Sequence, residues 1–441
     1  MGFKISISIS LILILSNAML MPRLTVSFYS EQTFKGFEDS IELILGLSDT
    51  PSSYQELTDL LTKHNIEIVG EISTHNKTMA IVAKFPITIE NTVLTEICTT
   101  GLSRYIEPNA RVKVVKFEPN DPEWTNSTHQ WGMQRINANW AWNITRGSRS
   151  VLTAIVDTGI DYNHEDLNRS YVLGGFDWVN NDNDPMDDEG HGTHCAGLVA
   201  AEINNGKGIA GLAQVRIMAE KSIDADGYGK PSDLANGILH AADQGANIIS
   251  MSWGTYFRSN AIYDAVQHAN NAGALLLAAA GNEEWSGRLY PAAFNEVIAV
   301  TATIIGDKPA EYTNYGNWVE LAAPGGNRAC PLWSTLRDNK YGDWYTYGTS
   351  VAVPHVAGVA ALIWSRFPNM SRDQVRIHLR KTAVDLGSPG FDEYYGYGRI
   401  DANASVARSP PNHDLVLLKW GCPPYMEVGK PATFNTTVHN Y

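Results

Sequence analysis

Residues 348–358 read GTSVAVPHVAG, and this stretch decides the fold. A turn of small residues precedes Ser350, and the run that follows, residues 351–364, is apolar on nearly every face. A helix that is hydrophobic all round has to lie inside a sizeable core. The unpaired backbone N–H groups and the positive dipole end at the start of such a helix stabilise an oxyanion that forms beside a serine hydroxyl. Ser350 is therefore the candidate nucleophile.

Two upstream motifs supply what a serine nucleophile needs. An alcohol is a poor nucleophile at neutral pH, so it requires a general base, and the base requires a partner that orients it. Residues 151–156 (VLTAIV) predict a buried strand that delivers Asp157, and residues 191–194 (HGTH) open a second helix with His191. His194 lies three residues further on, so a metal pair is the rival interpretation. No Glu stands between the two histidines in the arrangement that zinc peptidases use, which favours His191 as a base.

The order Asp, His, Ser in three separate motifs resembles the subtilisin-like serine peptidases. The resemblance covers about residues 121–407. It implies that His191 takes the proton from Ser350 and later gives it to the leaving amine, while Asp157 orients the imidazole and stabilises its cation. Residues 278–283 (AAAGNE) resemble the oxyanion segment of the family, which makes Asn282 the expected second donor. The alternative is a turn asparagine that accepts a local hydrogen bond.

The resemblance also implies a substrate cleft in which a peptide binds as an added strand. The residues that match the strands flanking the peptide are Gly227, Tyr228, Gly229, Ser252, Trp253 and Gly254. The residues that match the walls of the specificity pocket are Ser252, Trp253, Gly254, Ala279, Ala280 and Gly281. Trp253 replaces the leucine expected there, and Leu289 stands where a smaller residue is expected. We expect Leu289 to shorten the pocket.

Two acidic sets suggest structural Ca²⁺, a hard cation that prefers oxygen ligands. The first set matches the strong site of the thermitase branch, with side chains of Asp121, Asp166 and Asn205 and backbone oxygens near Glu202, Lys207 and Ile209. The second set lies in the loop before His191 and comprises Asp177, Asp182 and Asp184. A solvated acidic loop is the alternative for either set.

Strands and helices alternate from residue 151 onward, which predicts an α/β fold with a mostly parallel sheet covered by helices on both faces. Functional residues should then collect at the carboxyl ends of strands and the starts of helices. The expected strands are 151–156, 215–222, 247–251, 274–278 and 297–303, and the expected helices are 191–201, 232–244, 260–271, 349–366 and 371–382.

The rest of the chain divides into three further parts. Residues 1–18 combine Lys4, a short apolar run and a small-residue end, which favours a cleaved signal peptide over a membrane anchor. Residues 24–116 mix strand-like and helical runs, so we expect a small α+β unit. The resemblance implies that this unit is a prosegment, which chaperones folding and inhibits the site; a permanent N-terminal domain is the alternative. Residues 117–408 form the peptidase domain, and residues 409–441 resemble a linker and the beginning of an immunoglobulin-like β module.

Composition narrows the function further. A formal charge of -14 argues against nucleic acid as a partner, because phosphates need a basic surface. The resemblance to the subtilisin-like serine peptidases, together with the signal segment, implies a secreted or cell-surface serine endopeptidase that is stabilised by calcium, processes its own proenzyme, and acts on protein or peptide substrates; we expect it to be a monomer. We expect no stable membrane insertion after signal cleavage. The rival is a non-catalytic binding or cell-surface protein that keeps the peptidase fold.

Overall fold

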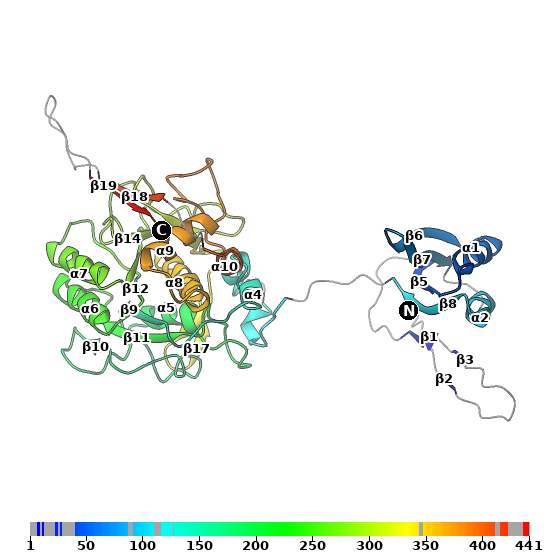
Figure 1. The fold of residues 1–441 in the computed structure, drawn as a ribbon. Coiled ribbons are helices and arrows are strands. Elements are labelled where there is room, and N and C mark those ends of the chain that lie inside the picture. Colours follow the sequence, from blue (N-terminus) through cyan, green and yellow to red (C-terminus); the bar gives the residue numbers. More distant parts are fainter. Residues whose placement is uncertain are drawn as a thin grey trace. The chain divides into compact units, whose positions relative to one another are not determined.

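The computed structural model describes residues 40–86, 91–109, 116–126, 128–343 and 347–410, together with the backbone of six short strands outside these ranges. Those strands are β1 (Ile7–Ser8), β2 (Leu11–Ile12), β3 (Arg23–Leu24), β4 (Ser27–Phe28), β18 (Leu415–Gly421) and β19 (Asn435–Asn440). The expected signal peptide and C-terminal module lie outside the described residues apart from these strands. The chain falls into two units, Met1–Val114 and Val115–Tyr441 (Figure 1).

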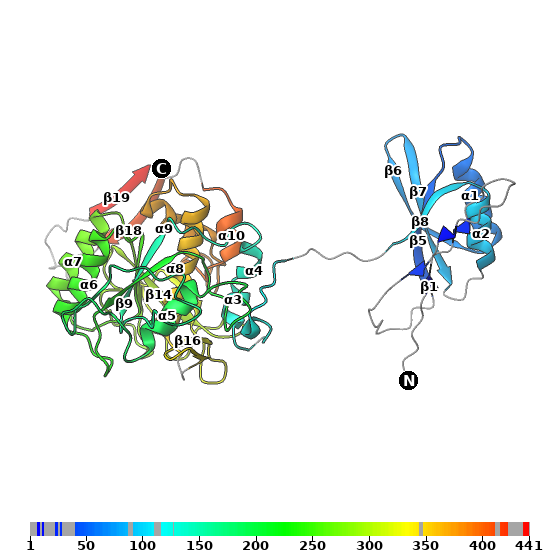
Figure 2. The ribbon, with the colours of Figure 1, turned by 90° about the horizontal axis from the view of Figure 1, so that it is seen from below.

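The first unit is a four-stranded antiparallel sheet with two helices, as expected for an α+β unit. Its strands lie in the order β6-β7-β5-β8, and both helices lie on the same side of the sheet (Figure 2). The core between them is apolar, with Leu45, Leu57, Ile81 and Ile97 fully buried. The elements are β5 (Ser40–Leu47), α1 (Ser53–Lys63), β6 (Glu67–Thr74), β7 (Lys77–Pro86), α2 (Asn91–Thr99) and β8 (Ser103–Pro108).

The second unit is built on a seven-stranded sheet in which every neighbouring pair is parallel. Its strands, in spatial order, are β10 (Phe176–Asp177), β11 (Arg216–Lys221), β9 (Leu152–Asp157), β12 (Ile248–Met251), β13 (Leu275–Ala279), β14 (Val297–Thr303) and β15 (Leu321–Pro324). Apolar residues run almost without interruption along β9, β13 and β14 because both faces of a parallel sheet are covered. The predicted fold class is confirmed.

Alternate residues of each strand point into two separate cores. Ile155 and Leu277 face α5 (His191–Ala200) and α8 (Thr349–Arg366), while Ala154 and Leu276 face α6 (Pro231–Asp243) and α7 (Asn260–Asn271). Both views place α6 and α7 together on one side of the sheet and α5 and α8 on the other (Figures 1 and 2). The wholly apolar α8 is buried, as its composition predicts.

Smaller elements complete the second unit. They are η1 (Pro122–Trp124), α3 (Trp131–Arg135), α4 (Ala138–Ala141), β16 (Ser334–Leu336), β17 (Lys340–Gly342), α9 (Arg372–Thr382) and α10 (Ala402–Ala407). No helix in the described part of the chain has the length and apolar character needed to cross a membrane.

Candidate active site

Asp157 and His191 meet where a strand ends and a helix begins. Asp157 is the last residue of β9 and His191 is the first residue of α5. The fully buried Asp157 accepts hydrogen bonds at Oδ1 from His191 Nδ1, at 2.7 Å, and from the backbone N–H of Thr158, at 2.8 Å. Because Nδ1 donates to the carboxylate, Nε2 is left as the proton acceptor.

The same carboxylate sets the charge state of the imidazole. Burial opposes the charged form of His191, but the attraction of Asp157 outweighs it, so the pKa of His191 is raised well above its usual value. Cys195, one turn further along α5, lies with Sγ 4.0 Å from His191 Nδ1 and 3.7 Å from the carbonyl oxygen of Ser350. It is 1% exposed, as expected for a small packed residue.

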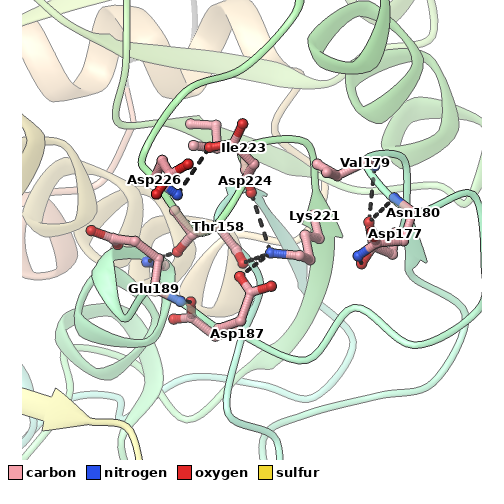
Figure 3. A network of polar contacts seen from close by, with 12 residues as sticks. Thr158, Asp177, Val179, Asn180, Asp187, Glu189, Lys221, Ile223, Asp224 and Asp226 are labelled. Atoms are coloured by element: carbon pink, nitrogen blue, oxygen red, sulfur yellow. Dashed lines mark hydrogen bonds and ion pairs between the residues drawn. The ribbon is translucent and has the colours of Figure 1, made fainter.

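Figure 3 shows part of the polar network that fixes the start of α5. The first N–H groups of a helix have no partner within the helix and need acceptors from elsewhere. Here each has one: Gly190 N donates to Asp187 Oδ1 (2.7 Å), His191 N to Glu189 Oε2 (2.8 Å), Gly192 N to Thr158 Oγ1 (2.9 Å) and Thr193 N to Asp187 Oδ2 (2.9 Å). The orientation of His191 therefore depends on Thr158, Asp187 and Glu189.

Lys221 links the segment before α5 to the turn after Asp157 and to Ile223 (Figure 3). Its side chain is 1% exposed, and its Nζ donates to Thr158 O (2.9 Å), Ile223 O (3.3 Å) and Asp188 Oδ1 (2.5 Å). These oxygens belong to the turn after Asp157, the beginning of the 224–229 loop and the segment that leads into α5. The roles of Lys221, Asp187 and Thr158 were not predicted from the sequence. The one local signal was that the strand ends in two adjacent charged residues, Glu220 and Lys221.

Ser350 and Asn282 lie on either side of Gly348. Ser350 is the second residue of α8, and Asn282 follows β13. A Cβ atom on Gly348 would stand 3.2 Å from both Ser350 Oγ and Asn282 Nδ2. The hydroxyl and the amide nitrogen thus border the same small space, which a larger residue at position 348 would fill.

Two hydrogen-bond donors beside Ser350 are available to a ligand. Asn282 Oδ1 accepts from the N–H and the hydroxyl of Thr349, at 2.8 and 3.0 Å, so Nδ2 is directed away from these bonds. Among the described residues, neither Asn282 Nδ2 nor Ser350 N has an acceptor. Two donors fixed at the start of a helix can hold an oxyanion.

The residues predicted to line the cleft lie on three loops. Tyr228 is 76% exposed, and its backbone N–H donates to Asp224 Oδ1 at 2.9 Å within a tight turn. Trp253 follows β12 and donates its indole N–H to Val156 O at 2.9 Å, next to Asp157. This contact is one that leucine could not make.

Backbone hydrogen bonds join two of the segments that are predicted to form the pocket. Thr255 and Tyr290 exchange two backbone hydrogen bonds of 2.8 Å, which ties the segment after Gly254 to the one that carries Leu289. Leu289 is 6% exposed and packs so closely on Gly254 that a Cβ atom there would overlap it. Ala279, Ala280 and Gly281 continue from the end of β13. Leu289 thus lies against Gly254, and its effect on the depth of the pocket stays a prediction.

The first acidic set brings two buried carboxylates together. Asp121 is 0% exposed and Asp166 is 1% exposed. Burial, with Asp121 nearby, raises the pKa of Asp166 to about 7, and burial also raises the pKa of Asp121. Buried acids of this kind are costly unless a cation or hydrogen bonds compensate them. The donor set therefore fits a hard cation such as Ca²⁺.

Hydrogen bonds arrange the other predicted ligands of this set. Asn205 donates through Nδ2 to Asp166 Oδ1 at 2.6 Å, so it presents nitrogen rather than oxygen to that acid. The backbone N–H of Glu202 donates to Asp166 O at 3.0 Å, and that of Ile209 to Asp166 Oδ2 at 3.3 Å. The backbone N–H of Lys207 donates to Asn205 Oδ1 at 2.8 Å. The backbone N–H of Asn205 donates to Asp121 Oδ1 at 3.1 Å, so the six residues lie in one local network.

The second acidic set fits a cation less well. Asp177 accepts from the backbone N–H groups of Val179 and Asn180, at 2.9 and 2.8 Å, so the turn itself uses this carboxylate. Asp184 accepts from the hydroxyl of Tyr162 at 2.6 Å. In the described ranges, Asp177, Asp182 and Asp184 do not bring three ligand atoms within 4.8 Å of one another. Calcium at this set stays a prediction.

His194, the rival for a metal pair, is fully buried and hydrogen-bonded. Its Nε2 lies 3.1 Å from Leu332 O, and burial lowers its pKa to about 3. His355, inside α8, bonds to Val351 O at 2.9 Å, and burial lowers its pKa to about 4. Both are therefore neutral, packed residues.

The chain is similar to known proteins. A family model described as the subtilase family matches residues 148–398. The chain is 41% identical over 306 residues to a thermophilic serine proteinase from Bacillus sp. (strain AK1), covering 69% of this chain and 73% of that protein. It is also 41% identical over 291 residues to thermitase from Thermoactinomyces vulgaris, covering 66% of this chain and 99% of thermitase. The halolysin-like extracellular serine protease Nep from Natrialba magadii is 37% identical over 389 residues, a match that covers 85% of this chain and 68% of that protein.

Proposed function

The chain belongs to the subtilase family and is a subtilisin-like serine endopeptidase, and from this premise we propose that Asp157, His191 and Ser350 form its catalytic triad with Asn282 in the oxyanion hole. The observation that carries the proposal is the 2.7 Å hydrogen bond between Asp157 Oδ1 and His191 Nδ1. It leaves the imidazole with a free Nε2 to serve as the base.

The reaction follows from these positions. Ser350 Oγ attacks the carbonyl carbon of the scissile peptide while His191 Nε2 takes the hydroxyl proton. Asp157 stabilises the imidazolium that forms. Ser350 N and Asn282 Nδ2 donate to the developing oxyanion, and His191 then protonates the leaving amine. Water releases the acyl group by the same steps in reverse.

Substrate selection follows from the loops around the triad. An extended peptide adds as a strand between residues 227–229 and 252–254, where glycines allow close approach of a foreign backbone. The side chain before the scissile bond enters the pocket between residues 252–254 and 279–281. Leu289 packed on Gly254 supports a shallow apolar pocket. We infer a preference for small and medium apolar residues.

We propose that Asp121, Asp166 and Asn205, with backbone oxygens near Glu202, Lys207 and Ile209, hold one structural Ca²⁺. The buried acids Asp121 and Asp166 support this, because a bound cation would supply the positive charge that compensates them. Thermitase, whose branch carries the site that this acidic set resembles, is 41% identical to this chain, and the match covers 99% of its length. The ion stabilises the fold and takes no part in the chemistry.

We further propose that the protein is exported as a proenzyme. Residues 1–18 are the signal peptide, residues 24–116 are the prosegment that chaperones folding and inhibits the site, residues 117–408 are the peptidase, and residues 409–441 begin a β module. A relative with "extracellular" in its name supports export. The separate hydrophobic core of the first unit supports its treatment as a removable domain.

Hydrolysis of a peptide amide by the purified full chain tests the function. We expect the wild type to be active and Ser350→Ala to be inactive while folded. We expect the active protein to lose everything before a cut between residues 112 and 120, and Ser350→Ala to keep its prosegment when expressed in a protease-free host. Normal processing of Ser350→Ala there would contradict self-cleavage, and an inactive folded wild type would contradict the function.

A further inference from the structure

Asn314, a buried residue outside the proposed triad, organises the loop that carries Asn282. It follows β14 in the chain and is 0% exposed. Its backbone N–H donates to Gly281 O at 2.9 Å. Its Oδ1 accepts from the backbone N–H groups of Glu283 and Trp285, at 3.0 and 3.1 Å. Asn314 thus makes three hydrogen bonds to the backbone of residues 281–285, one through its own backbone and two through its side chain.

Glu283 transmits this support to Asn282 itself. Glu283 Oε2 accepts from the backbone N–H of Asn282 at 2.8 Å and from Asn314 Nδ2 at 3.1 Å. The side-chain oxygen of Asn282 is meanwhile held by Thr349. The backbone of Asn282 and its amide group are therefore fixed from two different directions.

Tyr256 joins the network from the pocket side. It lies two residues beyond Gly254, donates its hydroxyl to Glu283 Oε2 and accepts from Asn314 Nδ2 at 3.1 Å. Burial and the bond to Glu283 raise the pKa of Tyr256 to about 12, so the hydroxyl stays protonated at neutral pH. The ring packs against that of Trp285, with centroids 4.9 Å apart.

The loop is tightly packed against Asn314 at Gly281. Gly281 has φ +107, a conformation that side chains rarely adopt, and a Cβ atom there would overlap the Asn314 amide. The loop can therefore approach Asn314 only because residue 281 is glycine. A donor that must be in place before charge develops gains from such rigid support, because no reorganisation is then needed during the reaction.

We propose that Tyr256, Glu283 and Asn314 are positioning residues that hold Asn282 in place for oxyanion stabilisation. The proposal rests on the role given above to Asn282 as the oxyanion donor. None of the three contacts substrate in this role. They act through the backbone N–H of Asn282 and through the loop on which it sits, and Tyr256 connects that loop to the wall of the specificity pocket.

A double-mutant cycle on the mature enzyme tests the proposal. Tyr256→Phe and Glu283→Gln are suitable because both side chains are exposed in part and both changes keep the side-chain size. Each should lower kcat for a peptide amide by roughly three- to tenfold with little change in KM. In an Asn282→Ala background each should lower kcat by less than about twofold, because the residue they position is gone. Tyr397→Phe, a change at another exposed tyrosine, is the matched control and should leave kcat unchanged.

Three outcomes would overturn the proposal. One is a wild-type kcat in both single variants. Another is a loss that lies in KM, which would assign Tyr256 and Glu283 to substrate binding. The third is a loss that is equally large with and without Asn282, which would mean a general structural effect. Because the cycle needs an active parent enzyme, failure of the proposed function appears earlier, as an inactive wild type.

Discussion

The amide oxygen of Asn282 accepts two hydrogen bonds from one residue, the backbone N–H and the hydroxyl of Thr349, at 2.8 and 3.0 Å. Thr349 Oγ1 also accepts from the backbone N–H of Gly281 at 3.0 Å, so the threonine holds both the side chain and the chain before it. An amide has one oxygen and one nitrogen. Once its oxygen is bound in this way, its nitrogen is committed to the space beside Ser350.

The first prediction concerns this amide. Asn282→Ala should lower kcat by roughly 10²–10³-fold, the cost typical of removing one oxyanion-hole donor. KM should barely change, since the donor acts on the charge that develops in the transition state. Asn282→Asp keeps an oxygen for Thr349 but has no amide donor, so it should lose at least as much. Steady-state kinetics on a peptide amide measure both values. A near-normal kcat in either variant would mean that Asn282 is not the oxyanion donor.

The second prediction concerns pH. The base works only when His191 is neutral, and its pKa is raised by Asp157, so the acidic limb of kcat/KM should fall above the ordinary histidine value of about 6.5. Activity should therefore rise with pH through that pKa. Asp157→Asn removes the attraction, so the limb should move to lower pH while kcat falls by roughly 10⁴-fold. A wild-type limb at or below the ordinary value would contradict this assignment.

The third prediction concerns calcium. A ligand that binds only the folded state stabilises it by an amount that grows with ligand concentration. A chelator should therefore lower the melting temperature of the mature enzyme, and Asp166→Ala should remove most of the difference between the curves with and without chelator. Asp243→Ala, a change at an exposed acid outside the set, should keep that difference. Identical wild-type melting curves with and without chelator would speak against the site.

The fourth prediction concerns Asp187, which caps the start of α5. It distinguishes an effect on His191 from the loss of stability that removal of any helix cap causes. Asp187 accepts from the N–H and the hydroxyl of Thr193 and from two further backbone N–H groups. Asp187→Ala should cost about 1–3 kcal/mol of unfolding free energy and should also lower kcat, because His191 begins this helix.

Ser371→Ala supplies the control for that prediction. Ser371 forms a capping box at the start of α9, away from the triad in sequence. Its loss should lower stability by a comparable amount, about 1 kcal/mol, without changing kcat. Denaturant unfolding and kinetics on both proteins provide the two readouts. A normal kcat in Asp187→Ala would show that Asp187 is not needed to orient His191.

The sequence was most informative where a local pattern determines the structure. The apolar run after Ser350 gave α8 with the predicted bounds, 349–366, and the run 297–303 gave β14. Both segments are buried on all sides, so composition alone identifies them. The edge strands β10 and β15 were not predicted, because two to four residues carry too little pattern.

One physical reason explains why the roles of Asn314 and Lys221 were not predicted from the sequence. Asn314 and Asn282 lie 32 positions apart in the sequence, and Lys221 meets Asp188 across a similar gap. Their roles arise from which loops the fold brings together, and a single asparagine or lysine gives no local sign of that. Asp177 was predicted as a metal ligand from its acidic surroundings. The structure shows its carboxylate accepting hydrogen bonds from N–H groups of its own turn, and calcium there stays a prediction.

The central claim, that Ser350 is a nucleophile activated by His191 and Asp157, can be measured directly. A fluorophosphonate probe forms a covalent bond with an activated serine, and peptide mapping identifies the labelled residue. In the mature wild-type enzyme we expect the label on Ser350, with labelling lost in Ser350→Ala and greatly slowed in His191→Ala. A folded wild-type enzyme that takes up no label, or that carries it on another serine, would contradict the account.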